Sequence, residues 1–338
     1  MTQMPGTAWT LGCLALSAAV TFGLIVLLKP LLQRYALARP NARSSHTIPT
    51  PQGGGIAIVA ATLGTALAAV LLLQGQVPHW IMALAAAATL LAAVGAIDDI
   101  RPLPVAPRLL LQILAIGIAI FSLPDDLRIA PFVAPAIERA LLVVAVLWFV
   151  NLTNFMDGLD WLTVAEVLPV TASLAILGLA ASLLPAAAVL LAVALFGAML
   201  GFAPFNKPVA RLFLGDVGSL PLGLLLAVLL IFLAASGHIV AAILLPLYYL
   251  ADATLTLLRR MRAGEQFWQA HRSHFYQRAT ANGFTVREVV ARVFILNLAL
   301  AGLAFVSVIL QSWAIRLAML AIGIALVSLL LRNFARPR

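Results

Sequence analysis

Long apolar runs recur along the whole chain, and short connections between them carry most of the polar residues. Runs of about 17–25 apolar residues can cross the roughly 30 Å hydrocarbon core of a membrane as helices, which satisfy their own backbone hydrogen bonds. Eleven runs are found, at residues 8–28, 53–73, 80–97, 109–123, 137–153, 163–180, 185–203, 218–236, 238–257, 290–310 and 313–331. Since the fourth run is short and the eighth and ninth are poorly separated, ten is the alternative count. The pattern predicts an all-α polytopic integral membrane protein.

Composition supports this fold class and excludes an ordinary soluble domain. Of the 338 residues, 63% are hydrophobic and 10% are charged, and the mean hydropathy is +1.08. The apolar runs extend from one end of the chain to the other, so residues 1–338 are predicted to form a single membrane-embedded domain. The lone Cys13 permits no internal disulfide.

The basic residues predict the orientation of the helices. With eleven spans, most of the 21 Lys and Arg fall on the side of the C-terminus, and only Arg128, Arg139 and Arg316 fall on the other. Because basic residues gather in cytoplasmic loops, the N-terminus is predicted outside and the C-terminus in the cytoplasm. The first ten residues carry no Lys or Arg, which argues against a cleaved signal peptide. The net charge of +9 matches this topology and the anionic membrane lipids, so no nucleic acid partner is expected.

Aspartates lie at the ends of three apolar runs, all on the predicted cytoplasmic side: Asp98 and Asp99, Asp157 and Asp160, and Asp216. Taken alone, Asp216 could simply cap a helix. Asp157 and Asp160 are three residues apart and would share a face on a helical turn, where like charges repel unless a cation offsets them. Mg²⁺ suits such a site because it takes one or two carboxylates and leaves positions for phosphates. Mn²⁺ is the expected substitute.

Two further segments on the same side offer groups that bind phosphate. The glycines at 53–55 open a helix, and a turn there, including Gly54, could present backbone N–H groups to an anion, although a tight turn alone is an equal explanation. His271, Arg272 and His274 lie in the longest connection. Beside a carboxylate–metal site they are predicted to hold phosphate oxygens, whereas in isolation they would be a solvated basic run.

In their order and shared side, five segments of the chain resemble the polyprenyl-phosphate N-acetylhexosamine-1-phosphate transferase family, in its polysaccharide-initiating branch. The segments are 39–55, Asp98-Asp99, 151–160, 206–219 and 271–278. The predicted active-site loops are 29–52, 98–108, 154–162, 204–217 and 258–290.

The resemblance implies roles for individual residues. Asp98, Asp99 and Asp157 would be the catalytic residues and Asp216 the principal metal ligand. Asp98 and Asp99 would lie near the lipid acceptor, one of them as a general base. Asp157 would organise the metal and the diphosphate. The remaining implied substrate-binding residues are Asn154, Asp160, Asn206, Phe213, Gly54, His271, Arg272 and His274, with Phe213 beside the nucleobase.

The resemblance also implies a reaction. N-Acetylhexosamine 1-phosphate would move from a UDP-sugar to undecaprenyl phosphate, with release of UMP, on the cytoplasmic face of the bacterial inner membrane. Direct attack by the lipid phosphate is favoured, and a double displacement through an aspartyl enzyme is the alternative. A homodimer is a further expectation.

Two positions depart from the family's pattern. Trp161 stands where the family commonly has Gly, so the pocket there could have a different shape. His271 and His274 replace the histidine triplet of the muramyl-pentapeptide branch, which favours UDP-N-acetylglucosamine or a deoxy-N-acetylhexosamine as donor and an O-antigen-like product.

The main rival is an ion-coupled secondary transporter. Transporter sites lie near the middle of the membrane, often in repeated halves, whereas these carboxylates lie at span ends and no repeat is found. Asp252 is the exception in depth, since it precedes Arg259 by seven residues, which places it about 10 Å inside the helix end. For Asp252 a functional role and a structural role are equally expected.

Overall fold

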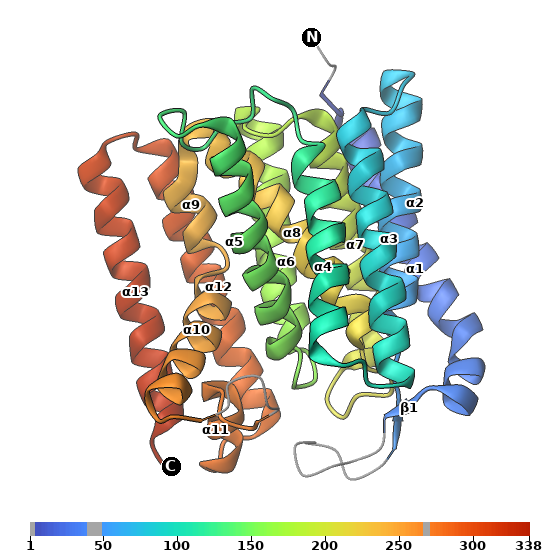
Figure 1. The fold of residues 1–338 in the computed structure, drawn as a ribbon, viewed down its shortest axis with the longest axis vertical. Helices are drawn as coiled ribbons and strands as arrows, with labels where there is room; N and C mark the ends of the chain where they lie inside the picture. The colour runs from blue at the N-terminus through green and yellow to red at the C-terminus, as the bar shows by residue number, and fades with distance from the viewer. Residues whose placement is uncertain (1–3, 39–48, 266–270) are drawn as a thin grey trace.

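The computed structural model describes residues 4–38, 49–265 and 271–338, which fold into a bundle of helices (Figure 1). The helices are α1 (Thr7–Tyr35), α2 (Gly54–Gln74), α3 (His79–Ile100), α4 (Val105–Phe121), α5 (Pro135–Met156), α6 (Leu162–Ala181), α7 (Ala186–Asn206), α8 (Asp216–Leu233), α9 (Ile239–Leu244), α10 (Leu247–Arg262), α11 (Phe275–Ala281), α12 (Val286–Ile309) and α13 (Trp313–Ala335), with a π-helical turn at Ala234–His238. Two short strands, β1 (Leu37–Ala38) and β2 (Thr50–Pro51), pair antiparallel after α1.

The prediction of an all-α polytopic membrane protein is confirmed. Among the described residues, nine helices are long and apolar enough to cross a membrane when Asp216–Leu244 is taken as one helix. The other two predicted spans correspond to α4, which has 17 residues, and to a broken pair, α9 and α10. The chain reverses at Gly237, whose φ of 86° is in the left-handed region, and Pro246 separates α9 from α10 because it has no N–H to donate.

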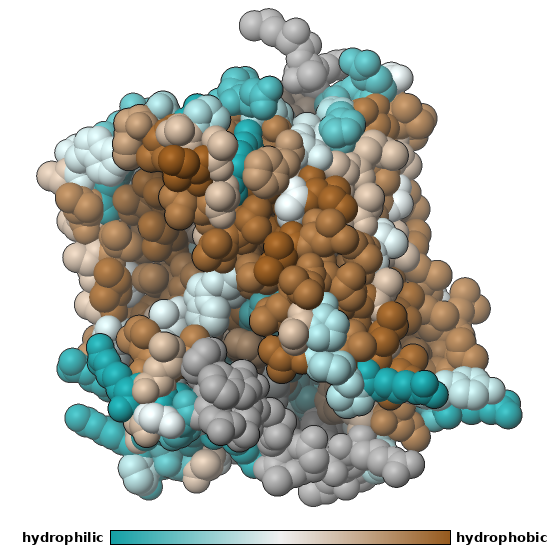
Figure 2. All heavy atoms as spheres, in the orientation of Figure 1, coloured by the Kyte–Doolittle hydropathy of each residue, from teal (hydrophilic) through white to brown (hydrophobic). Residues whose placement is uncertain are grey.

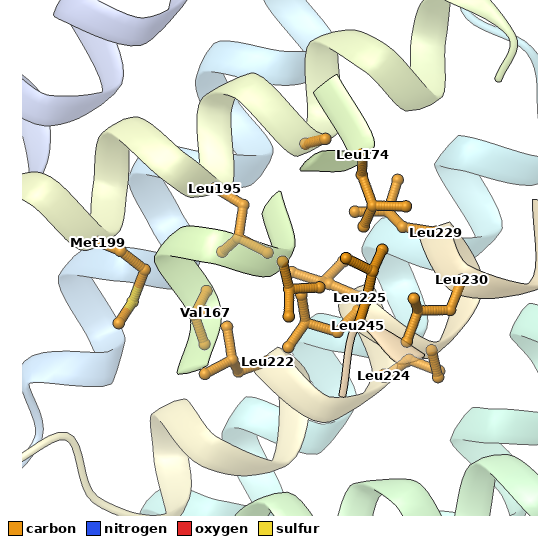
Figure 3. Close-up of a cluster of buried hydrophobic side chains, with 14 of the residues drawn as sticks. Val167, Leu174, Leu195, Met199, Leu222, Leu224, Leu225, Leu229, Leu230 and Leu245 are labelled. Carbon is orange, nitrogen blue, oxygen red and sulfur yellow. The ribbon is translucent and has the colours of Figure 1, made fainter. Parts of the chain in front are cut away.

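Helix α8 forms the centre of the bundle, since its most apolar stretch is wholly buried, whereas α1 and α13 lie at the periphery. Leu222, Leu225 and Leu229 of α8 pack with Leu195 of α7 and Val167 of α6 in the core (Figure 3). On the face shown in Figure 2, apolar side chains cover the surface between two polar ends, as expected for a membrane-facing bundle. The central position of α8 fixes the place of Asp216, its first residue.

A close contact with α3 also fixes the first turn of α8. A Cβ atom on Gly95 of α3 would lie 2.2 Å from the carbonyl oxygen of Asp216, closer than any side chain tolerates. Glycine therefore lets α3 approach the start of α8, and this contact brings Asp98 and Asp99 next to Asp216.

The helices extend further than the apolar runs predicted. Helix α1 continues to Tyr35 although the predicted loop starts at residue 29, and α3 includes Asp98 and Asp99 in its last turn. Hydropathy marks the length inside hydrocarbon, whereas polar residues continue a helix as long as its backbone bonds persist. The predicted loops are correspondingly shorter in the structure.

The predicted gathering of the polar connections at one end is confirmed. Helices α1, α3, α5, α7 and α10 end, and α8 begins, at the lower end of the bundle (Figure 1). Helix α1 begins at the upper end and α13 ends at the lower end, as an odd number of crossings requires.

Candidate active site

A polar pocket of about 210 Å³ lies among these connections. Seven of the predicted site residues line it: Asp99, Asn154, Asp157, Asp160, Asn206, Phe213 and Asp216. They come from the ends of α3, α5 and α7, the start of α8 and the loops between them. The fold therefore brings together residues that are more than a hundred positions apart in the chain.

Asp216 is fixed by partners on two other helices. The amide of Asn154 on α5 donates to Oδ1 of Asp216 at 2.8 Å and to Oγ of Ser219 at 2.9 Å. On α3, the carboxylate of Asp99 accepts a hydrogen bond from the backbone N–H of Asp216. Carboxyl groups gathered in one pocket repel one another unless a shared proton or a cation offsets their charge.

The neighbouring aspartates of α3 have different environments. Asp99 accepts hydrogen bonds from the backbone N–H groups of Asp216 at 3.0 Å and Val217 at 3.1 Å, so it caps the N-terminus of α8. Asp98 does not line the pocket; it binds the guanidinium of Arg108 at 2.8 Å and the N–H of Leu103 at 2.6 Å. Asp99 therefore combines a place in the pocket with a structural role, and Asp98 is held in an ion pair beside it.

The prediction that Asp157 and Asp160 share a helical face is wrong, because α5 ends at Met156 and residues 157–161 form an irregular turn. Asp157 accepts a hydrogen bond from the hydroxyl of Thr163, and Asp160 accepts one from the N–H of Ala210 at 2.9 Å. Both still line the pocket, from a loop and not from a helix.

The electrostatics of the pocket favour a cation. The pKa of Asp157 is raised to about 8, mainly by burial and also by the carboxylates of Asp216, Asp99 and Asp160, while the hydrogen bond from Thr163 opposes the rise. A divalent metal would reverse this effect by offsetting the negative charges.

The loop after Asp160 has a strained residue. Trp161 has a φ of 63°, in the left-handed region that glycine adopts freely and other residues adopt at a cost of about 1–2 kcal/mol. Its backbone N–H donates to Oδ1 of Asn206 at 2.7 Å, and its indole Nε1–H donates to the carbonyl oxygen of Ala203 at 2.6 Å. The predicted departure at Trp161 thus lies next to the pocket, where the ring caps the C-terminal end of α7.

The structure does not support the predicted phosphate-binding role of Gly54. The N–H of Gly54 donates to the carbonyl oxygen of Phe213, and that of Gly55 donates to Leu214, each at 2.9 Å. These glycine N–H groups therefore join α2 to the loop before α8, and Gly54 does not line the pocket. Residues 39–48, which hold the first part of the resembling segment 39–55, lie outside the described residues.

An apolar groove of about 530 Å³ adjoins the polar pocket between α4, α5, α10 and the loop before α11. Leu109, Val144 and Trp148 are among its apolar lining residues, and Arg108, His271 and His274 add polar groups. Asn154 lines both cavities. The carboxylate pocket and the groove therefore meet at this side chain. Helices α4, α5 and α10, which frame the groove, lie toward the viewer in Figure 1.

Asp252 holds the histidine loop. This fully buried carboxylate on α10 accepts hydrogen bonds from the backbone N–H groups of Phe275 at 2.9 Å and Tyr276 at 3.1 Å, and lies 3.3 Å from Nδ1 of His274. Of the two equal expectations for Asp252, the structure supports positioning of the loop. Arg272 is exposed and lines neither cavity.

Tyr276 connects the histidine loop to the aspartate loop. Its hydroxyl donates to the carbonyl oxygen of Phe155 at 2.9 Å and would lie 2.1 Å from a Cβ atom on Gly158. Glycine is thus required at position 158 by this contact. The loop that carries His271 and His274 is fixed against the loop that carries Asp157.

Sequence reasoning missed Gln52, Arg108 and Tyr276. Gln52 lines the polar pocket and donates to the carbonyl oxygen of Asp99 at 2.8 Å. Arg108, ten residues after Asp98, could have been found, because a basic residue that follows an acidic pair near the membrane surface is a natural ion-pair partner. Gln52 and Tyr276 had no comparable signal.

The comparisons with known proteins indicate one family. The model of the family "Glycosyl transferase family 4" matches residues 80–234. The chain is 31% identical over 300 residues, 77% of this chain and 72% of the relative, to a decaprenyl-phosphate N-acetylglucosaminephosphotransferase of Mycobacterium tuberculosis (strain CDC 1551 / Oshkosh). It is 26% identical over 294 residues, 81% of this chain and 79% of the relative, to a probable undecaprenyl-phosphate N-acetylglucosaminyl 1-phosphate transferase of Bacillus subtilis (strain 168).

A third relative comes from another branch. A phospho-N-acetylmuramoyl-pentapeptide-transferase of Lactococcus lactis subsp. cremoris (strain MG1363) is 32% identical over 205 residues, 55% of this chain and 60% of the relative. The chain belongs to glycosyl transferase family 4, the family of polyprenyl-phosphate sugar-phosphate transferases. The family resemblance found in the sequence is confirmed, and its assignment to the polysaccharide-initiating branch stays a prediction.

Proposed function

We propose that this protein transfers N-acetylhexosamine 1-phosphate from a UDP-sugar to undecaprenyl phosphate and so starts the assembly of a cell-envelope polysaccharide. The observation that carries the proposal is the shared wall at Asn154, which joins a carboxylate pocket to an apolar groove. A lipid phosphate and a water-soluble nucleotide sugar have to meet in one place, and this arrangement provides it. The relatives that match over most of the chain, which are named for N-acetylglucosamine, support an N-acetylglucosamine donor.

A divalent metal fits the pocket. The carboxylates of Asp99, Asp157, Asp160 and Asp216 line it. Mg²⁺ binds through one or two carboxylates and completes its shell with water and substrate phosphates. Asp216 and Asp157 would hold the ion, which would offset charge on the donor's diphosphate.

The remaining residues position the reactants. An oxygen of the acceptor phosphate attacks the phosphorus next to the sugar, the bond from that phosphorus to the bridging oxygen breaks, and UMP leaves with that oxygen. The acceptor needs no general base, because a phosphomonoester with a second pKa of about 6 is largely ionised at neutral pH. Asp98, paired with Arg108, accordingly needs no role as base. Arg108 and His271 at the groove contribute positive charge or N–H donors for the acceptor phosphate.

The orientation and location follow from the same proposal. The lower end of the bundle in Figure 1 faces the cytoplasm, where nucleotide sugars are made, and the membrane is the bacterial inner membrane. The positive-inside distribution of Lys and Arg supports this orientation.

The test uses purified protein in detergent with undecaprenyl phosphate, Mg²⁺ and a panel of radiolabelled UDP-N-acetylhexosamines. Label should enter the lipid as UMP is released, and EDTA should abolish both. Asp125→Asn, in an exposed loop at the opposite end, is the matched control for Asp216→Asn. Folded protein that neither binds nor turns over any donor would overturn the proposal and favour the transporter. Exchange of UMP into UDP-sugar without acceptor would instead indicate a double displacement.

A further inference from the structure

A second apolar groove, of about 590 Å³, lies on another part of the bundle. Its lining includes Val164 and Leu168 of α6, Ala203 of α7, and Val290 and Phe294 of α12. Helix α6 packs against both α7 and α12, so it forms the floor and the other two helices form the walls. The lining residues of α12 span two helical turns, or about 10 Å. The groove therefore has the form of a slot for a hydrocarbon chain.

The end of this groove toward the polar loops is positively charged. Lys207 and Arg287 line it there, and both are exposed. Lys207 has no hydrogen bond or ion pair with any described residue, and Arg287 makes one hydrogen bond, from Nη2 to the carbonyl oxygen of Pro208 at 3.3 Å. In the part of the chain that the structure describes, no acidic side chain lines the groove, and the nearest in sequence, Glu288, is bound to Arg338 at 2.6 Å. The charge complements an anionic head on an apolar tail.

Among the described residues, none lines both this groove and the carboxylate pocket. Trp161 forms part of the groove's wall, and its indole N–H donates to the carbonyl oxygen of Ala203 at 2.6 Å. A phosphate at Lys207 and Arg287 would therefore lie in a different cavity from Asp216. The acceptor lipid fits the other groove, which shares Asn154 with the pocket, and this one is left for a different lipid.

We propose that the groove of α6, α7 and α12 binds a bilayer phospholipid with a net negative headgroup. One acyl chain lies along α6, and the phosphate is held by Lys207 and Arg287. The inference goes beyond the proposed function and does not depend on it.

Native mass spectrometry of the full-length protein, titrated with phosphatidylglycerol or phosphatidylcholine, tests this site. Wild type should bind phosphatidylglycerol more tightly. The double variant Lys207→Gln/Arg287→Gln should bind it about tenfold more weakly, because it loses two charge-assisted contacts to phosphate. Arg262→Gln/Arg332→Gln removes the same charge from two exposed positions outside the groove and should leave binding unchanged.

A second variant tests the slot itself. Ala291→Trp adds a large side chain at an exposed position of the α12 wall and should weaken binding of both lipids while the protein stays folded. Equal affinity for the two lipids in wild type, or an equal loss in the control variant, would overturn the proposal. Displacement of phosphatidylglycerol by one equivalent of undecaprenyl phosphate would overturn it too, because it would assign the groove to the acceptor. The readout is binding, so a failure of the transferase reaction would not affect it.

Discussion

Two apolar grooves with positive charge at their ends flank the carboxylate pocket, and they differ in the residue that separates them from it. The groove of α4, α5 and α10 meets the pocket at Asn154, whose amide also binds Asp216. The groove of α6, α7 and α12 shares no described lining residue with the pocket and has Trp161, whose indole donates to the carbonyl oxygen of Ala203, in its wall. Both grooves have an apolar lining, so the lining does not distinguish the proposed substrate site from the proposed phospholipid site. What distinguishes them is contact with the carboxylate pocket.

The largest effect is expected for Asp216→Asn, which removes a negative charge from the pocket and leaves both grooves intact. Turnover should fall by more than about a hundredfold, since loss of even an outer-shell partner of a metal costs 10–100-fold. Phosphatidylglycerol binding by native mass spectrometry should not change. Turnover close to wild type, with Asp125→Asn as reference, would mean that the carboxylate pocket is not the reaction centre.

A smaller loss is expected for Asp252→Asn, which acts on the groove that meets the pocket. The amide cannot accept hydrogen bonds at both of its ends, so one of the N–H groups of Phe275 and Tyr276 would lose its partner, and His274 would lose the adjacent charge. A buried donor without a partner costs about 1–3 kcal/mol. Turnover should fall about tenfold to a hundredfold.

The readout for Asp252 has to separate positioning from folding. Thermal unfolding gives the stability loss, and kcat and KM for each substrate show whether the histidine loop moved. Arg262→Gln, at the exposed end of the same helix, serves as control. A variant that is destabilised yet has unchanged kcat and KM would show that Asp252 serves stability alone.

Arg108→Gln tests the entrance of the same groove. Arg108 lines the groove and pairs with Asp98, so the variant removes a cation near the expected acceptor phosphate. The KM for undecaprenyl phosphate should rise about tenfold, the loss of one charge-assisted contact. The KM for the UDP-sugar should stay near wild type, and Arg101→Gln, exposed in the loop before α4, should change neither. A rise in the sugar's KM alone would place the donor, and not the acceptor, at Arg108.

The aspartates could be found from the sequence because a carboxylate at the edge of hydrocarbon is costly and therefore stands out. Their position at the same end of the bundle followed from the alternating direction of successive membrane spans. The partners did not follow, because contacts such as Asp99 with the N–H groups of Asp216 and Val217 depend on how α3 packs on α8. Gly158 shows the same limit: its glycine is explained only by the Tyr276 hydroxyl, which is more than a hundred residues away. The irregular turn at Asp157 was missed because a spacing of three residues suggests a helix wherever helices dominate.

The smallest effect on turnover is expected for variants of Trp161, which forms part of the wall of the second groove. Trp161→Gly relieves a left-handed conformation that costs about 1–2 kcal/mol, and it loses the indole hydrogen bond to Ala203, worth about 1 kcal/mol, together with the packing of the ring. Trp161→Phe keeps both the strain and a ring but loses the hydrogen bond, so its free energy of unfolding should fall by about 1 kcal/mol. The two variants therefore separate the effect of the left-handed backbone from the effect of the ring in the groove wall. Urea unfolding measures the free energy of unfolding of each variant, and the transferase assay measures its turnover. Because Trp161→Phe leaves an aromatic wall, its turnover should stay within about threefold of wild type, whereas Trp161→Gly should let phosphatidylglycerol bind less tightly. If Trp161→Gly binds the phospholipid as well as wild type does, the wall at Trp161 is not what distinguishes the two grooves.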